Sequence, residues 1–155
     1  MLNDSARHSM ITQPDGSEEV RRLFYESTPE LASGRVEIKA IARERGHRCM
    51  LIVYPRDRSV DPVGCCVGPR GSRIKLVMQL ISGEHVDIIR WSESVEELIR
   101  NSLAPVVVRH IALDTASHRA IVMVDSKRSD AYAIDPVRLR LTSKAVGWAL
   151  QLVET

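Results

Sequence analysis

The stretch Val60-Asp-Pro-Val-Gly-Cys-Cys-Val-Gly-Pro-Arg-Gly-Ser-Arg73 decides the fold of this chain. Asp61 and Pro62 predict a helix start, because an aspartate accepts a hydrogen bond from the first turn and proline fits its first position. This helix must be short, since Gly68-Pro69-Arg70-Gly71 interrupts it, and a second helix opens at Ser72. The stretch therefore predicts two helices joined by a four-residue turn with glycine at both ends.

Around this stretch, the hydrophobic pattern predicts an α+β unit that occurs twice. Residues 36–43 alternate apolar and polar side chains, and the apolar run 49–54 predicts the second strand of a hairpin. The other expected elements are a helix at 20–31, a strand at 86–91, a helix at 93–103, strands at 106–113 and 120–124, two helices within 127–146 interrupted at Asp135-Pro136, and a strand at 148–153. This repetition predicts two similar units.

The composition fits one compact domain or two small ones. Of the 155 residues, 44% are apolar and 27% are charged, so a core can form. Residues 1–19 are polar and aperiodic, which predicts a flexible tail and excludes a secretory signal. No apolar run approaches the roughly 20 residues of a membrane span. We therefore expect a cytoplasmic protein that does not bind membranes.

Catalytic and metal-binding motifs are absent from the sequence. It contains no G-x-G-x-x-G, no G-x-x-x-x-G-K-[ST] and no G-x-S-x-G. Cys49, Cys65 and Cys66 lack the Cys-x₂₋₄-Cys spacing that structural zinc sites normally show, and we interpret them as buried thiols. We therefore expect no enzymatic activity, no metal and no cofactor.

The distribution of charge is more informative than its total of +2. Residues 35–75 hold 10 Lys/Arg against 4 Asp/Glu, while residues 1–34 are acidic and residues 76–155 are nearly neutral. A central segment with a net charge of +6 could attract a polyanion. The same arginines could equally be ordinary solvated residues on strand faces.

The turn at 68–71 has the features of a phosphate-binding loop. Its two glycines let another backbone approach closely, and the positive end of the next helix dipole points at the turn. Arg70 supplies a charge at the tip, and Arg73 and Lys75 flank it. A G-x-x-G turn between two short helices behind a hairpin matches the KH module, whose loop holds the backbone of about four nucleotides. The alternative is an ordinary helix–helix turn.

Several longer motifs resemble the tandem KH region of the bacterial transcription factor NusA. They are Arg35-Val-Glu-Ile-Lys-Ala-Ile-Ala-Arg-Glu44, the stretch 60–73, Asp87-Ile-Ile-Arg-Trp-Ser-Glu93 and Asn101-Ser-Leu-Ala-Pro105. The resemblance extends from about residue 21 to the C-terminus. It implies an α+β fold of two tandem type II (prokaryotic) KH domains, at 20–92 and 93–155, each with a three-stranded sheet and helices packed on one face.

The resemblance also implies a function. We expect a single-stranded RNA-binding protein that modulates transcription elongation, termination or antitermination, with RNA polymerase or other transcription factors as possible partners. The expected RNA-binding residues are Val67, Gly68, Pro69, Arg70, Gly71, Ser72, Arg73 and Lys75.

Two features depart from the family pattern. The polymerase-binding and OB-fold domains that precede the KH pair in the family are not found in this sequence, which leaves open a short protein or a piece of a longer one. In the second unit, the family has a G-K-R-G loop, whereas this chain has Asp135-Pro136 and no glycine. We expect Asp135 to be a single exposed charge and the second unit to be a scaffold. An alternative is a protein-interaction adaptor that docks on RNA polymerase or a ribosomal protein and has residual RNA binding.

Overall fold

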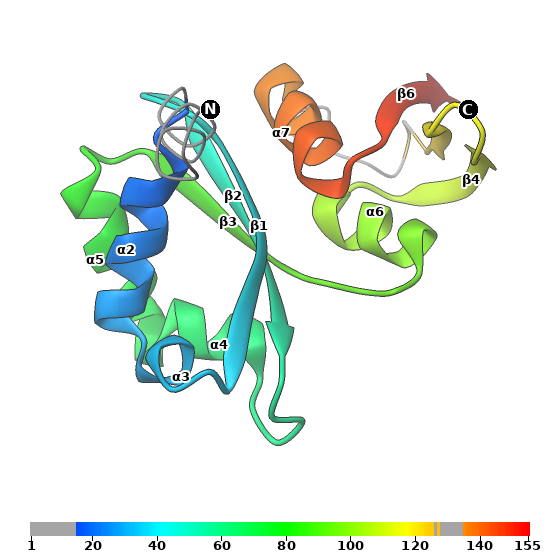
Figure 1. The fold of residues 1–155 in the computed structure, drawn as a ribbon. Coiled ribbons are helices and arrows are strands. Elements are labelled where there is room, and N and C mark those ends of the chain that lie inside the picture. The colour runs from blue at the N-terminus through cyan, green and yellow to red at the C-terminus, as the bar shows by residue number, and fades with distance from the viewer. Residues whose placement is uncertain (1–14, 126, 128–134) are drawn as a thin grey trace, which may run out of the picture.

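The computed structural model describes residues 15–125, 127 and 135–155, which form two α+β units side by side (Figure 1). The first unit consists of α2 (Ser17–Ser27), α3 (Pro29–Ala32), β1 (Val36–Glu44), β2 (Arg48–Pro55), α4 (Pro62–Val67), the 3₁₀ turn η1 (Pro69–Gly71), α5 (Ser72–Leu80) and β3 (His85–Arg90). The central strand β2 is antiparallel to β1 and parallel to β3. Parallel neighbours need a crossover connection, which α4 and α5 provide.

The second unit repeats this arrangement. It consists of α6 (Val95–Leu103), β4 (Val108–Asp114), β5 (Arg119–Val124), α7 (Pro136–Val146) and β6 (Ala149–Glu154). Strand β5 is central, antiparallel to β4 and parallel to β6. Both hairpins also carry a β-bulge at the same place, between Ile38 and Ala40 in β1 and between Val108 and His110 in β4.

Some element boundaries differ from the prediction. Helix α2 begins at Ser17, whose N–H donates to the Asp15 carboxylate, so the tail predicted at 1–19 includes three helical residues. The helix predicted at 20–31 is two helices, because Thr28 is extended immediately before Pro29. Strand β4 begins two residues later than predicted. Residues 1–14 and the first helix expected within 127–146 lie outside the described residues.

The helices of the first unit cover one face of its sheet, as expected. Their core is formed by buried residues of α2, α4 and α5 against inward-facing residues of the three strands, including Phe24, Cys66, Val77, Leu51 and Val86. Strand β2 is apolar on both faces, because Met50 and Ile52 are as fully buried as Leu51 and Val53.

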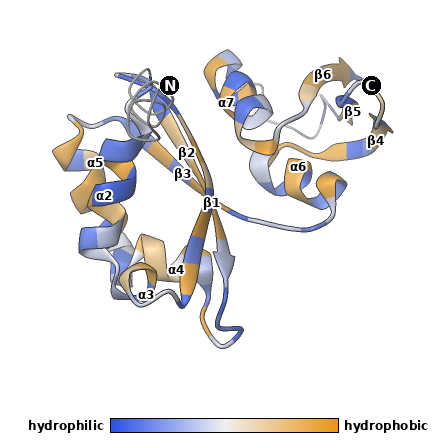
Figure 2. Cartoon of the chain, in the orientation of Figure 1, coloured by the Kyte–Doolittle hydropathy of each residue, from blue (hydrophilic) through white to orange (hydrophobic). Residues whose placement is uncertain are grey.

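The opposite face of the first sheet is covered by the second unit (Figure 1). Helix α7 lies across β1 and β2, and Leu141 packs with Ala42, Met50, Ile52 and Ile89 in one buried cluster. Figure 2 shows the hydrophobic residues along these strands and on α6 and α7 that form the boundary. The two units are therefore joined by a shared hydrophobic core.

Among the described residues, the second sheet has a buried core on one of its faces. Ile99 and Leu103 of α6 and Trp148 pack against the inward residues of β4, β5 and β6. On the other face, Ile121 and Val153 are 40% and 37% exposed. None of the described helices is long and apolar enough to cross a membrane.

Candidate nucleic-acid interface

Local interactions at α4 set the position of the predicted loop. The Asp61 carboxylate accepts the N–H of Val63 at 3.2 Å, and Pro62 occupies the first turn, so the helix begins as the sequence predicts. Helix α4 ends at Gly68, whose N–H donates to the carbonyl of Gly64 at 2.9 Å. The half-buried Val67 packs just before the loop, which places residues 68–71 at the surface.

The backbone of the loop needs glycine most at its first position. Gly68 has φ 78° and ψ 169°, a conformation that is essentially restricted to glycine. A Cβ there would lie 2.6 Å from Cγ and 2.9 Å from the backbone nitrogen of Arg73. Gly71 and Arg70 are both left-handed, with φ 74° and 56°, and a Cβ on Gly71 would meet nothing closer than 3.4 Å. The loop is thus a strained turn that brings Pro69, Arg70 and Gly71 near the start of α5.

Two basic side chains and a helix end converge on this turn. Pro69, Arg70, Ser72 and Lys75 are exposed, and the Lys75 ammonium group donates to the carbonyl of Arg70 at 3.2 Å. Helix α5 begins at Ser72 without a side-chain cap, so the positive end of its dipole faces the loop. The structure therefore brings seven of the eight predicted residues together at one turn, in which Pro69, Arg70, Ser72 and Lys75 form an exposed, positively charged surface.

Arg73 is the exception among the predicted residues. Its guanidinium donates to both carboxylate oxygens of Glu30 in α3, at 3.1 and 3.3 Å, and to the carbonyl of Cys65 at 2.7 Å. Arg73 therefore joins α3, α4 and α5 beneath the loop. All three hydrogen bonds come from Nη1, so Arg73 positions these helices, and its role as a flanking phosphate contact stays a prediction.

A shallow hollow extends from the loop along α5. It is lined by Lys75, Met78, Gln79, Ser82 and Gly83. Ser82 is left-handed, with φ 61°, and this turn of the chain places its side chain at the end of the hollow. Sequence reasoning missed Met78, Gln79 and Ser82 as candidate binding residues. Gly83 predicts where the helix at α5 ends, but nothing in the sequence indicates that the turn after this helix lines the hollow.

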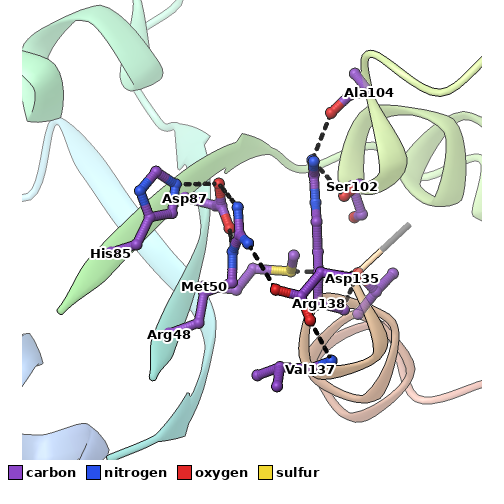
Figure 3. Close-up of polar contacts among 10 residues, drawn as sticks. Arg48, Met50, His85, Asp87, Ser102, Ala104, Asp135, Val137 and Arg138 are labelled. Carbon is purple, nitrogen blue, oxygen red and sulfur yellow. Dashed lines mark hydrogen bonds and ion pairs between the residues drawn. The ribbon is translucent and has the colours of Figure 1, made fainter. Parts of the chain in front are cut away.

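In the second unit, Asp135 takes part in a polar network at the boundary between the units (Figure 3). Its carboxylate accepts the N–H of Val137 at 2.8 Å, which caps α7, and pairs with Arg48 of β2 at 3.3 Å. Arg48 also pairs with Asp87 at 2.7 Å, and Asp87 accepts a hydrogen bond from His85 at 2.9 Å if that ring nitrogen carries its proton. The prediction of a single exposed charge at Asp135 was therefore wrong.

The same network shifts the acidity of its members. Hydrogen bonding to Asp87 is the main effect that raises the pKa of Arg48. Burial opposes the charge on Asp87, but hydrogen bonds and attraction from Arg48 outweigh it and lower its pKa. Burial lowers the pKa of Arg138, whose guanidinium donates to the carbonyls of Ser102 and Ala104 at the C-terminal end of α6. A cation there is stabilised by the helix dipole.

The fold and the loop together define the class of this protein. Each unit has a mixed three-stranded sheet, in which the central strand is antiparallel to one neighbour and parallel to the other. In the first unit, the two helices that connect the parallel strands meet at a G-x-x-G turn. These are the features of tandem type II KH domains, a class of nucleic-acid-binding protein.

Comparisons with known proteins identify the family. The model of the NusA-like first KH domain matches residues 15–91. The transcription termination/antitermination protein NusA of Thermus thermophilus is 40% identical over 136 residues, which cover 87% of this chain and 35% of that protein. NusA of Bacillus subtilis is 36% identical over 134 residues, covering 86% and 36%. The crystal structure of APE1850, with 19% identity and a TM-score of 0.63, covers 90% of this chain and 98% of that one.

The chain is therefore a NusA-like KH region, and residues 15–91 belong to the family of the NusA-like first KH domain. It spans about a third of the length of the two NusA proteins compared. The likeness to APE1850 extends over both units and shows the fold alone.

Proposed function

We propose that this chain binds single-stranded RNA through the loop at 68–71 and thereby modulates transcription elongation, termination or antitermination in the cytoplasm. The observation that carries the proposal is the conformation of Gly68-Pro69-Arg70-Gly71 at the uncapped start of α5. There the backbone, the helix dipole and two basic side chains face one exposed surface. The similarity to NusA supports RNA polymerase as a further partner.

The hollow along α5 supports single-stranded RNA, rather than a duplex, as the ligand. The hollow along α5 is open, and its lining combines apolar Met78 with polar Gln79 and Ser82. Unstacked bases could lie against this lining while the phosphates contact the loop.

The test replaces both residues at the tip of the loop, in Pro69→Asp/Arg70→Asp. Two negative charges against phosphate should lower the affinity for a single-stranded RNA of about ten nucleotides at least tenfold, roughly 1.4 kcal/mol. Fluorescence anisotropy gives the affinity, and thermal unfolding checks the fold. The matched control is Ala116→Asp/Arg119→Asp, in the exposed hairpin turn and at the first residue of β5, which changes the net charge equally.

A salt titration of the same complex provides a second readout. The slope of log affinity against log salt should correspond to about two to four phosphates on the single-strand relation, and it should become shallower in the loop variant. The proposal fails if the folded loop variant binds as well as the parent, or if the control variant loses affinity to the same extent.

A further inference from the structure

The two sheets present matching rows of residues on their outward faces. Counted from the hairpin turns, the rows of the first sheet are Glu44-Arg48-His85, Ala42-Met50-Asp87 and Ala40-Ile52-Ile89. The rows of the second sheet are Asp114-Arg119-Ala149, Ala112-Ile121-Gln151 and His110-Met123-Val153. The β-bulge follows the last row in both sheets, so this correspondence is fixed by the hydrogen-bond register.

The first of these faces is a helix-docking surface within this molecule. Leu141 of α7 lies over its apolar rows, and the Thr142 hydroxyl contacts the Met50 sulfur at 3.9 Å. Arg140 forms two hydrogen bonds with Glu44, at 2.8 and 2.9 Å, at the edge of the face. At that edge, Glu44 of the sheet thus pairs with Arg140 of the helix. Arg48 of the sheet likewise pairs with Asp135 at the start of the helix.

The second face has the same chemistry and no partner among the described residues. Its acid–base row is Asp114 and Arg119, which pair with each other in register across the hairpin. Its apolar rows include Ile121, 40% exposed, and Val153, 37% exposed. A hollow of about 260 Å³ lies on this face, lined in part by Ala112, Asp114, Arg119, Ile121, Ala149 and Gln151. Exposed branched aliphatic side chains beside a hollow indicate a contact surface.

We propose that the outward face of the second sheet binds an amphipathic helix of a partner protein, in the way that the first sheet binds α7. The partner helix places a leucine over Ile121 and Met123. It offers an arginine to Asp114 and an acidic residue near its N-terminus to Arg119. Charge complementarity at these two positions fixes the direction of the helix on the sheet. The chain can thus hold RNA on its first unit and a protein on its second.

A second copy of this chain is not the expected occupant. Its own α7 already covers its own first sheet, where Leu141 is only 2% exposed. The partner must therefore supply a helix that is free or that belongs to another protein.

The experiment uses a stapled peptide with the sequence of residues 135–147, which contains α7. The staple joins positions 139 and 143, since a free helix of this length is marginal in water. The peptide is titrated into the full chain, whose first sheet is occupied by its own α7. We expect the methyl signals of Ile121, Met123 and Val153 to shift, while that of Ile52 remains unchanged.

Two variants test the geometry of the complex. Ile121→Asp should weaken binding at least tenfold without changing the fold, because this side chain is exposed. Asp114→Arg should weaken it severalfold, and a peptide with Arg140→Glu should restore binding to that variant. The proposal is overturned if the peptide shifts no signal at 1 mM, if it shifts Ile52, or if Ile121→Asp binds equally well. Single-stranded RNA that shifts the same signals, or self-association that Ile121→Asp abolishes, would also overturn it.

Discussion

At the scale of single residues, the two glycines of the loop have different tasks. Gly68 has a backbone conformation that other residues rarely adopt, and it lies against the backbone of Arg73. Gly71 is in the ordinary left-handed region, where Arg70 also lies. In the G-x-x-G pattern, packing therefore makes Gly68 irreplaceable, whereas glycine at position 71 is only strongly favoured.

The first prediction compares alanine at these two positions. Gly68→Ala should lower the free energy of unfolding by about 2–3 kcal/mol, because the new Cβ forces α5 away from the loop. Gly71→Ala should lower it by only about 1 kcal/mol, the usual cost of a left-handed alanine. Urea unfolding of both variants measures the difference. Equal losses would mean that the contact with Arg73 does not constrain the loop.

Asp135 also acts through its contacts rather than its charge alone. It caps α7 and pairs with Arg48 of the other unit, so its replacement should affect stability. Asp135→Asn keeps the cap and should be tolerated, while Asp135→Ala should cost about 1 kcal/mol. Asp135→Lys should cost more, because a lysine would face Arg48. The same unfolding series measures this order, and a lysine variant as stable as the parent would contradict it.

At the scale of elements, the sequence predicted what local chemistry determines. The hairpin at 36–54 and the helix start at Asp61-Pro62 follow from alternation and capping, and both are confirmed. The docking of α7 on the first sheet depends on residues about 90 positions apart, such as Met50 and Thr142, so no local pattern identifies α7 as the element that covers this face. One signal was present: the unbroken apolar run 49–54 is typical of a strand buried on both faces.

The site was predictable to a similar extent. Its glycines and Arg70 are fixed by a short motif, whereas the engagement of Arg73 with Glu30 requires α3 to lie beside α5. The hollow formed by Met78, Gln79 and Ser82 likewise depends on how the chain turns after α5. Charged residues near a motif can be recognised from sequence, but their partners cannot.

The contacts between α7 and β1 give the boundary a defined response to pH. The hydrogen bonds from Arg140 are the main cause of the lowered pKa of Glu44, whose ordinary value is 4.5. Asp87, with an ordinary value of 3.8, is also lowered. A carboxylate with a lowered pKa stabilises the folded state above its unfolded pKa, and this contribution is lost as the pH falls through its folded pKa.

The stability of the chain should therefore be constant near neutral pH and fall below about pH 4.5. Urea unfolding between pH 3 and 7 measures this dependence. Arg140→Gln should be less stable at pH 7 and should show a smaller fall on acidification, because the pKa of Glu44 is then closer to its ordinary value. If Arg140→Gln loses stability in parallel with the parent at every pH, Glu44 does not contribute to the effect.

At the scale of the whole molecule, the two units form one structure with two surfaces for which we propose binding functions. The first unit presents the loop at 68–71, and the second covers the back of the first sheet while leaving its own sheet open. The RNA affinity that we propose for the loop and the packing of the second unit on the first sheet are therefore linked only through the stability of the folded chain. A change at the boundary should leave the loop intact as long as the first sheet remains covered.

The extent of this dependence can be measured by weakening the boundary in the full chain. Leu141 is 2% exposed and lies over Ala42, Met50 and Ile52. Leu141→Ala should therefore cost about 2–5 kcal/mol, as expected for a truncated core leucine. Because the units share this core, unfolding should remain a single transition when followed by the fluorescence of either Trp91, in the first unit, or Trp148, in the second.

A chain that ends at residue 104 provides the complementary measurement. It would keep α6 but lose α7, which covers Ala42, Met50 and Ile52 of the first sheet, so it should unfold at lower urea concentration or associate. Adding Met50→Lys and Ile52→Thr, which make this face polar, should suppress association in the truncated chain but destabilise the full chain. If the truncated chain unfolds at the same urea concentration as the full chain, the second unit does not support the first. The packing of the second unit on the first sheet would then need another explanation, such as the helix-binding face itself.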